Sequence, residues 1–132
     1  MDAATRRMVQ VRAGFRCEYC CTHEDDEPYS FHLEHIVPKK HGGNDDSSNL
    51  AWSCQSCNLG KSSNLSGWLR GEVVALFHPR RQHWNRHFHW KGPRLLGKTK
   101  SGRATIQVLN INSEDRIILR RLLIDLGEFP PT

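Results

Sequence analysis

The sequence predicts an α+β fold in which a small core is followed by a basic extension of mixed helices and strands. Three observations lead to this prediction. The chain has 132 residues, which fits one domain. A segment that predicts a strand lies between two Cys-x-x-Cys pairs, and the second pair lies at the start of a segment that predicts a helix. The two halves of the chain also differ in charge. We therefore expect a core over residues 1–64 and an extension over residues 65–132, packed on the core as one domain.

The N-terminal segment predicts a short helix. Residues 5–15 place apolar side chains between arginines at helical spacing, and Gly14 ends the pattern. Residues 22–30 (THEDDEPYS) are acidic, polar and contain proline, which predicts a surface loop.

A strand and a second helix are expected next. Residues 31–38 (FHLEHIVP) predict a strand that proline stops, and the turn-rich KKHGGNDDSS leads to the apolar segment 50–52. Residues 54–63 contain neither proline nor paired glycine, and Cys54, Asn58 and Lys61 fall on one side of a helix.

The second half predicts two strands and a last helix. Residues 73–77 (VVALF) form a candidate strand, residues 80–90 are ambiguous, and residues 102–112 (GRATIQVLNIN) are rich in β-branched residues and predict a strand. Ser113 is a good N-cap for a helix that ends near Gly127. Acidic residues occupy its first turn, and its expected apolar face consists of Ile117, Ile118, Leu122 and Leu126.

The composition restricts the class of protein. Hydrophobic residues make up 37% of the chain, below the roughly 45–50% of an average globular domain, so the core needs a further brace. No run approaches the roughly 20 apolar residues that cross a bilayer, and the N-terminus lacks the apolar stretch of a signal peptide. We expect a soluble cytoplasmic protein without a membrane partner.

Four of the five cysteines form two pairs of metal-ligand spacing, Cys17/Cys20 and Cys54/Cys57. Cytosolic thiols stay reduced, so this spacing indicates metal binding rather than disulfides. Four thiolates suit tetrahedral zinc, and with no open coordination position the zinc would be structural. Cys21 is left over, as a spare thiol or as a replacement for Cys20.

The net charge of +5 is unevenly distributed. Residues 1–64 carry seven Lys/Arg and nine Asp/Glu, whereas residues 65–132 carry twelve and five. Within residues 65–103 the cations alternate with Trp68, Trp84, Phe88 and Trp90. Cations and flat rings suit nucleic acid, whose phosphates would be contacted by Arg80, Arg81 and Arg86. The alternative is a solvated basic face over core aromatics.

Three residues that can carry hydrolytic chemistry lie between or beside the cysteine pairs. Glu34 and Asn58 offer the oxygen ligands that Mg²⁺ or Mn²⁺ prefers, and the imidazole of His35 can accept a proton near neutral pH. Adjacent residues of a regular strand point to opposite faces, so we expect a bend at Glu34 and His35.

The segment LEHIVPKKHGGNDDSSNLAWSCQSCNLGKSS resembles the HNH endonucleases. The similarity runs from Cys17 to about Ser63 and rests on the acid-His pair, the Gly-Gly turn, the Asn-Leu pair, the second cysteine pair followed by asparagine, and a lysine. It implies a ββα-metal (His-Me) finger in which a hairpin and a helix hold a divalent ion. The acid is commonly Asp and here is Glu34, and the last His of the family name is Asn58.

The resemblance also implies the roles of the site residues. His35 is the general base, Glu34 and Asn58 hold the catalytic ion, Asn49 braces the loop, and Lys61 lies near the phosphate. We therefore predict a metal-dependent DNA endonuclease or nickase with structural Zn²⁺ and catalytic Mg²⁺ or Mn²⁺. An RNA-directed nuclease and a non-catalytic nucleic-acid-binding or adaptor module remain alternatives. The sequence leaves the oligomeric state open.

Overall fold

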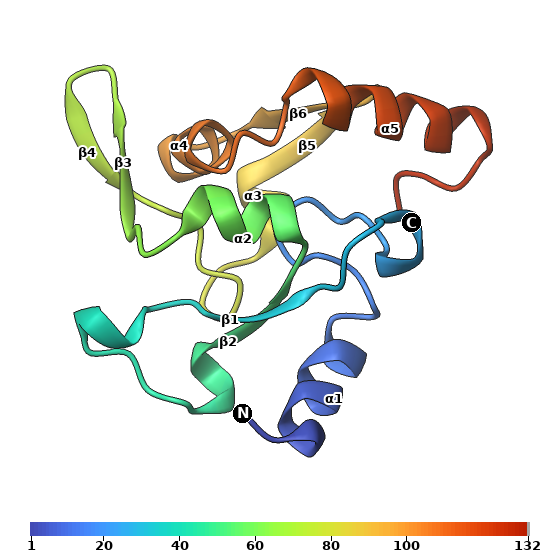
Figure 1. Cartoon of the computed structure of the whole chain (residues 1–132). Coiled ribbons are helices and arrows are strands. Elements are labelled where there is room, and N and C mark those ends of the chain that lie inside the picture. The colour runs from blue at the N-terminus through green and yellow to red at the C-terminus, as the bar shows by residue number, and fades with distance from the viewer. Residues whose placement is uncertain (132) are drawn as a thin grey trace. The chain divides into compact units, whose positions relative to one another are not determined.

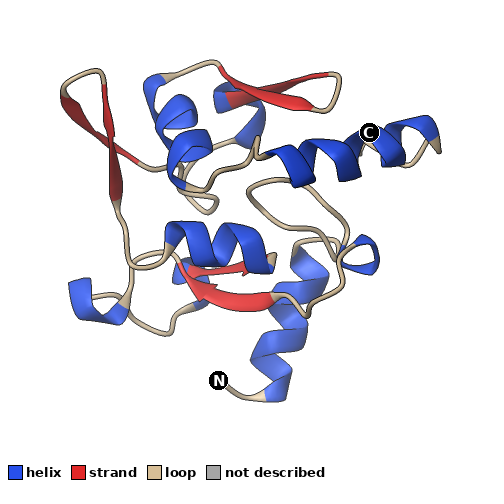
Figure 2. Cartoon of the chain, turned by 45° about the horizontal axis from the view of Figure 1, so that its top comes forward, coloured by secondary structure: helices blue, strands red, loops and turns tan. Residues whose placement is uncertain are grey.

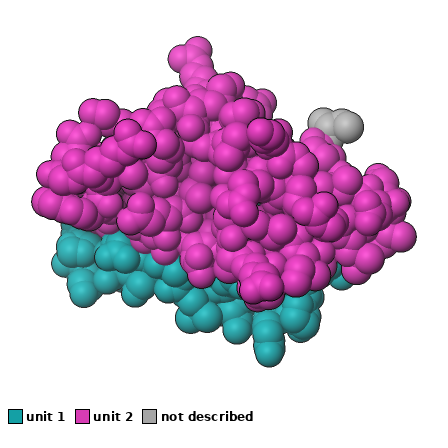
Figure 3. Space-filling view, turned by 90° about the horizontal axis from the view of Figure 1, so that it is seen from above, with its two compact units in different colours: residues 1–64, 78–81 teal, residues 65–77, 82–132 magenta. Residues whose placement is uncertain are grey.

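The fold is mixed α/β, with five α-helices and three short antiparallel strand pairs among residues 1–131, the part of the chain that the structure describes (Figure 1). The structure is a computed structural model. The chain divides into two compact units (Figure 3). The first consists of Met1–Asn64 together with His78–Arg81, and the second of Leu65–Phe77 and the chain from Gln82 onward. None of the helices in residues 1–131 is long and apolar enough to span a membrane.

The first unit begins with the expected helix, α1 (Ala3–Arg12). Its first turn is capped by Asp2, whose Oδ1 accepts a hydrogen bond of 2.7 Å from the backbone N–H of Thr5. The helix ends before Gly14, which adopts a positive φ of 65° that glycine tolerates without strain. The acidic loop that follows contains only a short 3₁₀ turn, Glu24–Asp26.

A ββα arrangement forms the centre of the first unit. Strand β1 (His32–His35) pairs antiparallel with β2 (Leu50–Ser53), and α2 (Gln55–Lys61) follows directly (Figure 2). The connection between the strands contains two 3₁₀ turns, Lys39–His41 and Ser47–Asn49. All four residues of β2 are buried, so this hairpin anchors the unit. The expected strand at residues 31–38 and helix at residues 54–63 are confirmed.

The second unit contains two hairpins and three helices. One hairpin pairs β3 (Ser66–Leu69) with β4 (Glu72–Ala75), and the other pairs β5 (Phe88–Lys91) with β6 (Arg94–Gly97). The short helix α3 (Trp84–His87) runs straight into β5, which is why residues 80–90 gave an ambiguous pattern. Helix α4 (Lys100–Val108) packs against β3, β4 and β6.

The strand predicted at residues 102–112 is wrong, because most of this segment is helix α4. Thr99 caps the helix by accepting a hydrogen bond from the backbone N–H of Gly102. The hydroxyl of Thr105 donates to the carbonyl of Ser101 and accepts from the N–H of Phe77. Packing against the hairpins and a good cap therefore outweigh the strand preference of the β-branched residues.

The last helix, α5 (Glu114–Asp125), is confirmed, but its predicted apolar face is wrong. Ile118, Leu122 and Leu126 are 61%, 56% and 63% exposed, whereas Leu123 and Arg120 are buried. The guanidinium of Arg120 donates to the carbonyls of Pro93 and Ile111 and lies over the ring of Trp90, so a cation outside the predicted face lies on the buried side of the helix.

Candidate functional site

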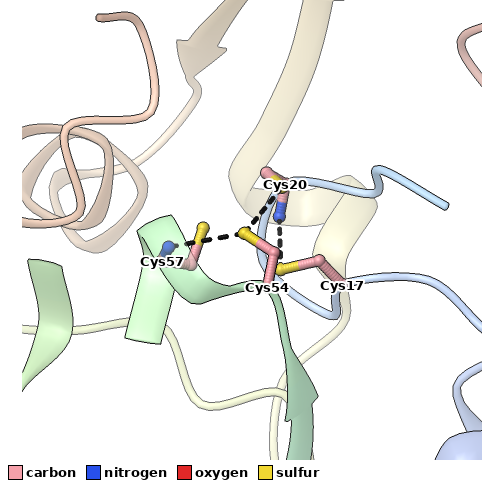
Figure 4. A group of neighbouring side chains, drawn as sticks. All are labelled: Cys17, Cys20, Cys54 and Cys57. Atoms are coloured by element: carbon pink, nitrogen blue, oxygen red, sulfur yellow. Dashed lines mark hydrogen bonds between the residues drawn. The ribbon is translucent and has the colours of Figure 1, made fainter. Parts of the chain in front are cut away.

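The four paired cysteines meet in one buried cluster (Figure 4). Their sulfurs all lie within 4.8 Å of one another, and the Sγ atoms of Cys20 and Cys54 are 3.7 Å apart. Zinc–sulfur bonds of about 2.3 Å in a tetrahedron place sulfurs about 3.8 Å apart, whereas a disulfide needs about 2.05 Å. The spacing therefore fits a metal such as zinc.

Both cysteine pairs use the same local geometry. The backbone N–H of Cys20 donates to Cys17 Sγ, and that of Cys57 donates to Cys54 Sγ, at 3.5 and 3.4 Å. Cys54 is also the N-cap of α2, so the second pair fixes the start of that helix. Cys21 lies outside the cluster, which settles that Cys20 supplies the fourth sulfur.

Proximity and burial make the thiols hard to ionise without a cation. Burial raises the pKa of Cys57, and hydrogen bonds from the neighbouring sulfurs, that of Cys17 first, raise the pKa of Cys54. A divalent cation reverses this preference because metal binding stabilises thiolates. The cluster is thus suited to a bound metal ion.

Glu34 lies in a buried polar group on the inner face of β1. Its Oε1 accepts a hydrogen bond of 2.9 Å from the hydroxyl of Tyr19 and forms an ion pair of 2.9 Å with Lys61 Nζ. Oε2 is buried and has no hydrogen-bond partner within the described residues. Burial raises the pKa of Glu34, while the charge of Lys61 acts in the opposite direction. One carboxylate oxygen is engaged and the other can accept a ligand.

His35 lies on the opposite face of the strand. Its Nε2 is 2.7 Å from Oδ1 of Asp45, which also pairs with Lys39. The hydrogen bond from His35 is the main cause that lowers the pKa of Asp45, so this carboxylate is ionised at neutral pH. A carboxylate only accepts, so Nε2 of His35 donates, and in the neutral ring Nδ1 carries the lone pair. Asp45 therefore orients the imidazole.

The bend expected at Glu34 and His35 lies after these residues. The ladder continues through His35, which pairs with Leu50, and only then does the chain turn. In this regular strand the acid and the histidine are held on different faces.

Asn49 closes the loop between the strands. Its Oδ1 accepts from the N–H of Val37, and its Nδ2 donates to the carbonyls of Val37 and Asn44. Gly43 packs so closely against this loop that an added Cβ would lie 1.7 Å from the carbonyl oxygen of Val37. Asn49 thus has the loop-bracing contacts that the resemblance implied.

Lys61 and Asn58 lie one turn apart on α2. Lys61 is 2% exposed, and its ammonium donates to the carbonyl of Ile36 in addition to pairing with Glu34. Asn58 is half-buried. The structure therefore gives Lys61 an internal position beside the acid, where it neutralises a buried charge.

The three predicted phosphate-contact arginines have different surroundings. Arg80 pairs with Glu18, both being largely buried, and burial lowers the pKa of Arg80 to about 10. Arg81 and Arg86 are exposed. The ion pair gives Arg80 a structural partner inside the first unit, whereas the other two can meet an external anion.

Of the four aromatic residues in the predicted basic patch, three pack within the second unit. Trp84 contacts Phe88 and Trp90 at ring separations of 5.1 and 6.0 Å, and Phe88 is buried. Trp68 on β3 is 63% exposed. Most of these rings are thus core residues, and Trp68 alone of the four is available for stacking.

Comparison with protein families settles what the ββα segment is. The model of the HNH endonuclease family matches residues 17–64. This segment is an HNH domain.

A curated relative resembles a longer part of the chain. The Septu protein PtuB of Bacillus thuringiensis is 30% identical over 111 residues, which are 83% of this chain. The chain spans 41% of the length of that relative. No solved structure matches. The HNH family indicates a nuclease-type function and metal binding.

Two residues of this HNH domain site escaped the sequence analysis. Asp45 lies in a stretch of turn-forming residues, where an aspartate is usually read as part of a turn. Tyr19 lies between two cysteines and contacts Glu34 only through the fold. The contact of Asp45 with His35 spans ten residues, so spacing alone gave no signal for it.

Proposed function

We propose that the HNH domain cleaves phosphodiester bonds in DNA by divalent-metal-dependent hydrolysis. The observation that carries this proposal is the hydrogen bond of 2.7 Å between Nε2 of His35 and Asp45. A base and the group that orients it are the parts that activate water for attack. His35 is 25% exposed, so its ring is open to solvent and to a substrate.

The proposal puts the catalytic cation at Glu34, on the other face of β1 from His35, so the phosphate that is cut has to reach both groups at the end of the strand. Oε2 of Glu34 is buried and lacks a hydrogen-bond partner among the described residues, and such an atom is usually completed by a bound ion or a water. Glu34 and Asn58 would hold Mg²⁺ or Mn²⁺, both of which favour oxygen ligands. When bound, the ion would neutralise charge that develops on the phosphate and the leaving oxygen.

The protein's own groups account for the remaining chemistry. Nδ1 of His35 takes the proton of the attacking water, and Asp45 holds the ring and stabilises the imidazolium that forms. Lys61 fixes the carboxylate of Glu34 through the ion pair. Asn49 keeps the loop that carries Asp45 closed. Each group then has one role in positioning or proton transfer.

A non-catalytic nucleic-acid-binding module is the second candidate, and the ion pair of Lys61 with Glu34 favours it. The ammonium already neutralises the carboxylate at 2.9 Å, which lowers the need for a metal ion there. In that case the domain keeps the ββα fold and the cysteine cluster and binds nucleic acid without cutting it.

A plasmid-nicking assay separates the two candidates. Zinc-loaded protein is incubated with supercoiled DNA and, in parallel, with RNA across Mg²⁺ and Mn²⁺ titrations, with EDTA and His35→Ala as controls. Metal-dependent nicking of DNA that His35→Ala abolishes supports the nuclease. Cleavage of RNA but not of DNA would show that the substrate is RNA and that the DNA proposal is wrong. Binding without any cleavage supports the module.

A further inference from the structure

A polar cavity of about 180 Å³ lies within the first unit, against the loop that joins β1 and β2. It is lined by Val37, Gly42, Gly43, Asn44, Ser48, Asn49, His78 and Arg81. A water molecule occupies about 30 Å³ of liquid, so the cavity admits a phosphate group with some of its hydration. The function proposed above does not use it.

A short return of the chain supplies one side of this cavity. The chain leaves the first unit after Asn64 and rejoins it for only four residues, His78–Arg81. Arg80 anchors this return by its ion pair with Glu18, whose other carboxylate oxygen accepts the backbone N–H of Trp52 at 2.8 Å. The return is therefore fixed to β2.

His78 lines the cavity with a ring whose orientation is fixed by the chain that follows it. Its Nδ1 accepts the backbone N–H groups of Arg80 and Arg81, at 3.2 and 3.3 Å. An imidazole nitrogen that accepts carries no proton, so the proton of the neutral ring lies on Nε2. Burial lowers the pKa of His78, and the positive charges of Arg81 and Lys61 lower it further, in keeping with a neutral ring.

The lining favours an anion. The guanidinium of Arg81 is an exposed cation, the amides of Asn44 and Asn49 and the hydroxyl of Ser48 are polar, and no carboxylate of the described chain lines the cavity. Arginine binds phosphate oxygens through paired N–H groups, which gives both charge and geometry. The chemistry of the lining matches a phosphate monoanion better than a carbohydrate or an apolar ligand.

The cavity is lined by the loop that carries Asp45, the partner of the proposed catalytic base. Val37 follows His35 by two residues, and Asn44 directly precedes Asp45, the partner of His35. A group bound here lies against the same loop that orients the base.

We propose that this cavity is a binding site for a phosphate of the nucleic-acid backbone, with the guanidinium of Arg81 as its main donor. The proposal rests on the nucleic-acid substrate of the proposed function and adds to it a phosphate bound against the loop that carries Asp45. It gives residues outside the HNH segment a direct part in holding the substrate.

Duplex binding by the zinc-loaded full chain tests this proposal. Affinity for a short DNA duplex is measured by fluorescence anisotropy over a salt series without divalent ions. Arg81→Ala should weaken binding roughly tenfold and lower the salt slope by about one, because one phosphate contact is lost. His78→Gln should weaken binding less, and Arg81→Lys should restore part of the loss. Arg121→Ala, which removes an exposed arginine of α5, is the matched control.

Titration with inorganic phosphate separates the sources of the ligand. Shifts of the His78 imidazole and the Ser48 amide in NMR spectra, absent in Arg81→Ala, support the cavity as the site. If phosphate binds but duplex affinity does not depend on Arg81, a backbone site is excluded. If Arg81→Ala and Arg121→Ala behave alike in both assays, the proposal is overturned even where the wild type cuts DNA. If the wild type cuts nothing yet binds duplex through Arg81, the nuclease proposal fails and this one stands.

Discussion

At the scale of single residues, the proposed chemistry depends on the contact between His35 and Asp45. The hydrogen bond of 2.7 Å selects the tautomer in which Nδ1 carries the lone pair. The sequence resemblance implies a role for the histidine but none for the aspartate that orients it. A histidine in such a pair is expected to matter more for turnover than for binding.

His35→Ala should therefore lower cleavage by roughly 10²- to 10⁴-fold, the usual contribution of a positioned general base. Zinc content, melting temperature and duplex affinity should stay close to those of the wild type, since the ring is partly exposed and outside the zinc cluster. Single-turnover nicking rates and anisotropy measure the two effects separately. A variant that loses affinity and rate together would contradict the assignment of a proton-transfer role.

The pKa of Asp45 provides a test at the same scale. It is lowered from an ordinary value of 3.8, first by the hydrogen bond from His35 and then by that from Lys39. A carboxyl with a depressed folded pKa stabilises the native state above its unfolded pKa, and this stabilisation is lost as the pH falls through the folded pKa. The stabilisation by this contact should thus be complete above the unfolded pKa of about 4 and be lost as the pH falls from there through the lower folded pKa.

In His35→Ala the titration midpoint of Asp45 should rise toward 3.8. NMR of the side-chain carboxyl carbon of Asp45 measures this midpoint. Asp26 is the internal reference, because the described contacts include none between Asp26 and His35. A midpoint that does not move would show that the histidine is not the main partner.

At the scale of elements, the loop between β1 and β2 is defined by Gly42 and Gly43. Gly42 adopts a φ of 90°, and a Cβ at Gly43 would lie 1.7 Å from the carbonyl oxygen of Val37 and 3.0 Å from Asn49 Nδ2. The Gly-Gly turn is thus a requirement of backbone packing in this chain.

Gly43→Ala should destabilise the protein by about 1–3 kcal/mol, the usual effect of forcing atoms into a packed site, and should reduce nicking through displacement of Asn49 and Asp45. Chemical denaturation and the nicking assay check this. Gly92→Ala is a suitable comparison, because Gly92 has a positive φ and no atom within 4 Å of an added Cβ, whereas Gly43 has no positive φ and its cost comes from the collision with Val37. A Gly43→Ala variant as stable as the wild type would contradict the collision.

Prediction at this scale succeeded where the local pattern and the tertiary packing agree. The ββα elements and the cysteine cluster follow from patterns within a few residues of each other. The segment 102–112 was misassigned because Thr99, Gly102 and Thr105 favour a helix through a cap and through contacts with Phe77 and His87. Such contacts join parts of the sequence that no local window covers.

The apolar face of α5 shows the opposite difficulty. Its helical period was correct but its inner side was not, because Arg120 reaches carbonyls of Pro93 and Ile111 and is buried with Leu123, leaving Ile118 exposed. A long side chain with several donors satisfies buried carbonyls that a leucine cannot. The hydrophobic periodicity of a sequence reports which side chains are apolar, and it does not show which backbone carbonyls need a hydrogen-bond donor.

At the scale of the whole molecule, the cysteine cluster links the two ends of the HNH segment. The chain has a modest apolar content, and the four sulfurs join a loop to the start of α2 across more than thirty residues. Folding energy in such small frames comes in large part from the metal.

Cys54→Ser should therefore lose about one zinc per chain and the cooperative unfolding of the first unit, whereas Cys21→Ser, outside the cluster, should keep both. Elemental analysis and circular dichroism melting give these readouts, and a chelator should reproduce the first result in the wild type. If Cys54→Ser folds fully without metal, zinc does not stabilise the fold and the prediction is wrong.

The return of residues 78–81 makes the first unit discontinuous in sequence. The family match ends at residue 64, yet the carboxylate of Glu18 finds its cation only at Arg80, sixteen residues later. A fragment cut at the family boundary would bury a carboxylate without its counter-charge, a defect that costs several kcal/mol in proteins. Residues 65–77, which include the hairpin of β3 and β4, belong to the second unit and separate the two parts of the first unit in sequence.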